Sequence, residues 1–126
     1  MKADLLAQRV TNQEVGKIGE DIACRVLADN GWSIISRNWR CRYGEIDVIA
    51  VKGQEISFIE VKTRRGKSHG SGIQAIDPRK LNRIRKLARL WLQSSSDFFT
   101  QINIDALEVQ LHDDLSSKVR YFREVA

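Results

Sequence analysis

Asp47, Glu60 and Lys62 are the residues whose types and spacing are best suited to chemistry. Two carboxylates held side by side favour a divalent cation such as Mg²⁺, which prefers oxygen and is commonly held by one or two carboxylates plus water and substrate phosphate. Such an ion activates water and relieves the charge that builds on phosphorus oxygens during phosphodiester hydrolysis. A neighbouring lysine can orient the water or stabilise the transition state. The trio therefore predicts metal-dependent phosphodiester cleavage, if the fold brings the three side chains together.

A β-hairpin is predicted to bring Asp47, Glu60 and Lys62 together. The segments on either side of Gly53-Gln54 are rich in Ile, Val and Phe, and a glycine in this place suits a two-residue type II′ turn. Counting back from the turn places Asp47 directly opposite Glu60, with Lys62 further along the same face. Directly opposed Cβ atoms lie about 4.5 to 5.5 Å apart, so the two like charges repel unless a cation lies between them.

The other face of this hairpin is predicted to be apolar and to pack on a helix. Its members are Ile46, Val48, Ala50, Ile59 and Val61.

Glu20 is a fourth candidate for the metal site. It lies at the edge of the apolar stripe of the first predicted helix, from where it could approach the cation directly or through water. The competing interpretation makes Asp47 and Glu60 edge-strand charges that form ordinary surface salt bridges with Lys62 and Arg64.

Residues 62–90 are strongly basic. They contain ten Lys or Arg and one acidic residue, whereas the rest of the chain has 11 basic and 15 acidic residues. A positive surface beside a negative remainder is typical of a polyanion binder, although a solvated face would give the same count. The residues expected on phosphates are Arg64, Arg65, Lys67, Arg79, Lys80, Arg83 and Lys86, and Tyr43 is the candidate for stacking on a base.

Length and composition indicate one globular domain. The chain has 126 residues, of which 42% are hydrophobic and 29% charged, so it is expected to fold alone or as a homodimer. No apolar run approaches the roughly 18 residues of a membrane span, and the first ten residues lack the apolar stretch of a secretion signal. We therefore expect a cytoplasmic protein with no membrane partner, and a flexible segment over 1–10.

Apolar periodicity and turn residues predict the order αβββαββ, and thus the α/β class in its α+β form. The expected elements are a helix that begins at a Thr11-Glu14 capping box and ends at Asn30-Gly31, strands over 32–39, 45–50 and 55–63, a mobile loop over 64–76, a helix from Asp77-Pro78 to the serines at 94–96, and strands over 98–111 and 119–125.

Several of these motifs resemble known families. Asp47, twelve further residues and then Glu60-Val61-Lys62 resemble the PD-(D/E)XK signature of the restriction-endonuclease-like superfamily. A longer arrangement resembles the YraN-type family of predicted bacterial endonucleases, which is distantly similar to archaeal Holliday-junction resolvases. It comprises Gly16-Lys17-Ile18-Gly19-Glu20, residues 31–38, Gly44-Glu45-Ile46-Asp47 and residues 58–64, within a similarity that runs from about Glu14 to Trp91.

The resemblance implies a single nuclease-like domain over 1–126, with a restriction-endonuclease-like fold in which helices flank a mixed central sheet. It gives Glu20, Asp47, Glu60 and Lys62 the site positions, and adds the Val61 carbonyl to Asp47 and Glu60 as ligands of Mg²⁺ or Mn²⁺. Ile46 stands where the superfamily's nominal proline would be.

The activity so implied is a metal-dependent endonuclease that hydrolyses the phosphodiester bonds of DNA, including branched or structured DNA. One alternative is a nucleic-acid-binding module with the same fold and no turnover. Another is an interaction subunit whose basic segment contacts an acidic protein.

Overall fold

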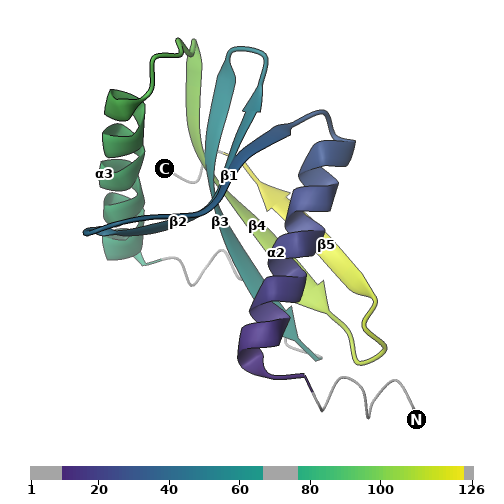
Figure 1. The fold of residues 1–126 in the computed structure, drawn as a ribbon. Helices are drawn as coiled ribbons and strands as arrows, with labels where there is room; N and C mark the ends of the chain where they lie inside the picture. Colours follow the sequence, from purple (N-terminus) through teal and green to yellow (C-terminus); the bar gives the residue numbers. More distant parts are fainter. Residues whose placement is uncertain (1–9, 67–76, 124–126) are drawn as a thin grey trace.

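The computed structural model describes residues 10–66 and 77–123 and confirms the predicted order of elements (Figure 1). The elements are α2 (Asn12–Asp29), β1 (Ser33–Cys41), β2 (Gly44–Lys52), β3 (Glu55–Arg65), α3 (Pro78–Ser94), β4 (Gln101–Leu111) and β5 (Ser117–Phe122). Lys67, residues 1–9, and most of the predicted loop over 64–76 lie outside the described residues. In the described ranges, neither helix is both long and apolar enough to span a bilayer.

Both helices begin at the predicted caps. Thr11 Oγ1 accepts a hydrogen bond from the Glu14 N–H at 3.1 Å and donates one to Glu14 Oε1 at 3.0 Å. The Asp77 carboxylate accepts from the Arg79 N–H at 2.9 Å, immediately before Pro78 at the start of α3. These caps satisfy N–H groups that have no partner within the helix, and so define where each helix starts.

The five strands form one mixed sheet in the order β1-β2-β3-β4-β5. Strands β3 and β4 are parallel and the other neighbours are antiparallel, so α3 is the crossover that a parallel pair requires. Helices α2 and α3 pack on opposite faces of the sheet (Figure 1). The mixed central sheet flanked by helices is therefore confirmed.

The β2–β3 hairpin has the predicted register. Its pairs run from Lys52–Glu55 at the turn, where Gly53 has the φ of 61° that a type II′ turn requires, to Val48–Ile59. Beyond that pair, β2 continues beside β1 while β3 continues beside β4, and the two ribbons diverge (Figure 1). The sheet therefore forks one residue before the predicted meeting point of the two acids.

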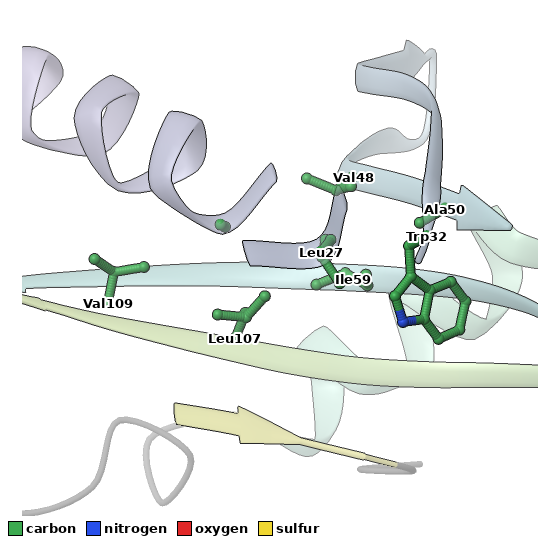
Figure 2. Packing of buried hydrophobic residues seen from close by; sticks show 8 residues of the cluster. Leu27, Trp32, Val48, Ala50, Ile59, Leu107 and Val109 are labelled. Atoms are coloured by element: carbon green, nitrogen blue, oxygen red, sulfur yellow. The ribbon is translucent and has the colours of Figure 1, made fainter. Parts of the chain in front are cut away.

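The hydrophobic core is divided between the two faces of the sheet. On the α2 face, Figure 2 shows a cluster that includes Leu27, Trp32, Val48, Ala50, Ile59, Leu107 and Val109. The α3 face buries Ile46, Ile49, Ile56, Phe58, Ile84, Leu87, Ala88 and Ile104.

The predicted face of β2 on which Ile46 lies was wrong. Ile46 was expected to share a face with Val48 and Ala50, but it packs in the α3 cluster while the other two pack under α2. Two-stranded ribbons twist more strongly than wide sheets. Once β2 leaves β3 at the fork, it is free to twist, and strict alternation of faces ends there.

Gly19 lets α2 approach β3 beside the fork. A Cβ added at Gly19 would lie 1.9 Å from Thr63 Oγ1 and 2.8 Å from Thr63 Cβ. Rotating the threonine moves its Oγ1 but not its Cβ, so the helix and strand would have to separate. We expect Gly19→Ala to lower the free energy of unfolding by about 1–3 kcal/mol in urea titrations.

Gly16 in the same helix provides the matched control, because nothing lies within 4 Å of a Cβ added there. Gly16→Ala should stabilise the protein by up to about 1 kcal/mol through helix propensity. Equal effects of the two substitutions would contradict the close contact between α2 and β3.

Candidate functional site

An open cleft of about 960 Å³ lies between the first turns of α2 and the fork of the sheet. Glu20 lines it from α2, Asp47 from β2, Val61 and Thr63 from β3, and Arg37 from β1. Three of the predicted site residues, Glu20, Asp47 and Val61, are thus brought together in one cleft.

Asp47 lies at the fork, where its side chain replaces a backbone partner. The Val61 N–H points toward β2, but the backbone pairing of β2 with β3 ends at Val48–Ile59. An N–H that is partly shielded from water still needs an acceptor, and the Asp47 Oδ2 provides it at 2.8 Å. The aspartate is therefore fixed by the sheet itself rather than by a flexible loop.

The Asp47 carboxylate is held in an unfavourable electrostatic environment. Burial, followed by the negative charge of Glu60, raises the pKa of the Asp47 carboxyl from 3.8 to about 7. The charges of Glu20 and Glu45 raise it further, and the Val61 N–H opposes the shift. A cation at the fork would relieve this repulsion.

The Glu20 carboxylate is held by hydrogen bonds from two residues of β1. Asn38 Nδ2 donates to Glu20 Oε1 at 2.7 Å, and Arg37 Nη2 donates to the same oxygen at 3.2 Å. Asn38 has a φ of 53°, which asparagine tolerates better than most residues. Sequence reasoning missed Arg37 and Asn38, because nothing local marks two β1 residues as partners of a helix glutamate.

Glu60 and Lys62 lie on the α3 side of β3, so the prediction that they share a face with Asp47 was wrong: Asp47 is not paired with Glu60 and lines the α2 cleft instead. Phe58, two residues before Glu60, packs under α3, and alternation carries Glu60 to the same face. There the Glu60 carboxylate forms an ion pair with Lys80, with 2.5 Å between Glu60 Oε1 and Lys80 Nζ. Lys62 forms no ion pair with another described residue. Glu60 is close enough to affect the pKa of Asp47, but in this structure its carboxylate contacts Lys80.

The acidic side chains do not form a ready-made metal cage. Within residues 10–66 and 77–123, no three His, Cys, Asp or Glu side chains are close enough together to hold a metal ion by themselves. Any divalent cation here would need few protein ligands and others from water or substrate, which is the coordination that Mg²⁺ commonly adopts.

Sequence comparison places the chain in a family. The profile described as "Uncharacterised protein family UPF0102" matches residues 19–109, a span that includes Glu20, the fork and α3. The chain belongs to this family. The resemblance to YraN-type proteins is thereby confirmed at the level of UPF0102 membership.

Other UPF0102 proteins match most of the chain. The UPF0102 protein of Nocardia farcinica is 46% identical over 107 residues, which cover 85% of this chain and 84% of that protein. Those of Rhodococcus opacus and Syntrophomonas wolfei are each 40% identical, over 90% and 87% of this chain and 96% and 95% of their own lengths.

In this UPF0102 protein, α3 presents a basic face beside the fork. The helix has no acidic residue, and its exposed basic residues include Arg79, Lys80, Arg83 and Lys86. Tyr43, at the tip of the β1–β2 hairpin, is 45% exposed, and Lys86 Nζ lies 4.1 Å from the centre of its ring. The structure therefore groups five of the predicted nucleic-acid-binding residues around α3.

Two other predicted phosphate-binding residues lie elsewhere. Arg64 Nε lies 3.6 Å from Glu108 Oε1 of the neighbouring strand. Arg65 lines the α2 cleft and donates from Nη1 to the Val10 carbonyl at 2.5 Å. Strand alternation explains why these consecutive residues lie on opposite faces. Arg64 shares the face of Glu60 but pairs with Glu108 of β4, whereas Arg65 lies on the α2 side.

Proposed function

We propose that this UPF0102 protein is a cytoplasmic endonuclease of the PD-(D/E)XK type that hydrolyses the phosphodiester bonds of DNA with Mg²⁺ or Mn²⁺. The observation that carries the proposal is Asp47 at the fork: a half-buried carboxylate whose pKa is raised to about 7 by desolvation and by the charge of Glu60. Repulsion between two acids at the meeting point of two strands costs stability, and perturbed carboxylates in clefts are often functional.

The residues at the fork fit a hard divalent cation. Asp47 and Glu60 would supply carboxylate oxygens. The Val61 carbonyl is expected to face the fork as its N–H does, because both groups of a strand residue point to the same neighbouring strand. Glu20, in the same cleft as Asp47, could hold a water molecule bound to the cation. Two carboxylates with water and phosphate oxygens are sufficient for Mg²⁺.

A bound metal would activate water and neutralise charge on the phosphate. Asp47 would position the metal, because the hydrogen bond from the Val61 N–H fixes the orientation of the Asp47 carboxylate. Lys62, without an ion-pair partner among the described residues, is available to orient the attacking water or to stabilise the pentavalent transition state. The basic face of α3, with Tyr43 beside it, would bind the DNA backbone and an exposed base.

The proposal is tested by incubating branched and single-stranded DNA with the protein and Mg²⁺ or Mn²⁺. We expect the wild type to cleave DNA and EDTA to abolish this cleavage. The cleavage rate of Asp47→Asn should be lower than that of the wild type by at least about a hundredfold. Glu45→Gln is the control, since Glu45 is an exposed acid that lines the same cleft and pairs with Arg40. Equal cleavage by all three proteins would rule out Asp47 as a metal ligand.

A binding module without turnover is the second candidate. The ion pair between Lys80 and Glu60 favours it, because a carboxylate that is already neutralised needs no metal. This candidate predicts DNA binding that weakens with salt but does not depend on Mg²⁺ or on Asp47. Calorimetric titration with Mn²⁺ separates the two, because only a nuclease site gives heat that disappears in Asp47→Asn.

A further inference from the structure

We propose that Lys80 is an internal counter-ion that controls metal loading: it neutralises Glu60 until a nucleic-acid phosphate draws it away. The inference rests on the proposed function and adds to it a coupling between DNA and metal binding. Lys80 would thus be a positioning residue as well as a member of the basic face.

The ion pair joins a shielded acid to an exposed base. The Glu60 side chain is 14% exposed and that of Lys80 is 49% exposed, and their charged atoms are 2.5 Å apart. Glu60 is therefore largely shielded from solvent, whereas the lysine reaches it from the first turn of α3. The four-carbon stem of a lysine lets its ammonium group move to another partner without movement of the helix.

Lys80 and a divalent cation would compete for the same carboxylate. Both carry positive charge, so a metal on Glu60 beside the ammonium group at its present position would be strongly repelled. Asp47, by contrast, accepts the Val61 N–H and forms no ion pair with a base among residues 10–66 and 77–123. Without DNA, a cation would therefore meet one available carboxylate, Asp47, and one occupied carboxylate, Glu60.

A phosphate on α3 would change this balance. Lys80 lies on the same helix as Arg79 and Arg83, all three are exposed, and the helix lacks acids, so a bound DNA backbone would offer Lys80 another anion. Movement of Lys80 to the phosphate would leave Glu60 available to the cation. By thermodynamic linkage, DNA then tightens metal binding and metal tightens DNA binding by the same factor.

The test measures Mn²⁺ affinity directly, by electron paramagnetic resonance of free Mn²⁺ at pH 7.5, with no DNA present. We expect Lys80→Met to bind Mn²⁺ about tenfold more tightly than the wild type, and Lys80→Arg, which keeps the charge, to resemble the wild type. Arg85→Gln is the control on the same helix, because Arg85 is exposed and hydrogen-bonds to Asn82.

A second arm adds a short DNA duplex. DNA should tighten Mn²⁺ binding by the wild type about tenfold and that by Lys80→Met much less. Equal Mn²⁺ affinities of the wild type and Lys80→Met without DNA would overturn the inference and leave the nuclease proposal standing. No Mn²⁺ binding by any variant, with or without DNA, would overturn both.

Discussion

Asp47→Asn is expected to raise the free energy of unfolding at pH 8 by up to about 4 kcal/mol. The wild-type carboxyl, with its pKa raised from 3.8 to about 7 mainly by burial, holds a proton in the folded state that the unfolded chain releases. Stability therefore falls as the pH rises from about 4 to about 7, and stays low above that range. Asparagine carries no charge, and its amide oxygen can still accept the Val61 N–H.

Urea titrations of the wild type and Asp47→Asn at pH 5, 6, 7 and 8 measure the effect. The gain should be greatest above pH 7 and should shrink toward pH 4, while the exposed control Glu45→Gln stays within about 0.5 kcal/mol of the wild type. Added Mn²⁺ should stabilise the wild type and not Asp47→Asn. A variant with the same pH dependence as the wild type would show that Asp47 is not electrostatically strained.

Lys62→Gln should slow the chemical step by about a hundredfold or more and leave Mn²⁺ affinity nearly unchanged. Lys62 forms no ion pair with a described residue, so its loss leaves no buried partner charge. Its role in the proposed mechanism is to stabilise charge in the transition state, which affects rate rather than metal binding.

Single-turnover cleavage rates and Mn²⁺ titrations separate these two quantities for Lys62→Gln. Lys118→Gln, on the exposed part of β5, is the matched control for loss of a lysine charge and should cleave as the wild type does. An unchanged rate in Lys62→Gln would remove Lys62 from the mechanism. A large loss of Mn²⁺ affinity would instead assign it to the metal site.

Local signals in the sequence predicted most of the fold. Thr11 with Glu14 and Asp77 with Pro78 located the helix starts, and Gly53 specified the hairpin turn and its register as far as the Val48–Ile59 pair. Each of these features depends on residues a few positions apart in the chain, so their patterns survive in the sequence.

The geometry of the candidate site depends on longer-range packing. The hairpin count could not reveal that β2 leaves β3 before Asp47 meets Glu60, because β1 on one side and β4 on the other determine the fork. The Lys80 contact with Glu60 depends in the same way on where α3 docks. The sequence thus predicted the candidate residues, but not which of them share a face.

The most direct test of a shared cation at the fork is the anomalous density of Mn²⁺ in crystals of this protein grown with Mn²⁺ and a short DNA duplex. We predict a peak within about 2.5 Å of oxygens from both Asp47 and Glu60, with Lys80 turned away from the glutamate. A Mn²⁺-saturated complex with no peak there, and with Glu60 still bound to Lys80, would contradict the account.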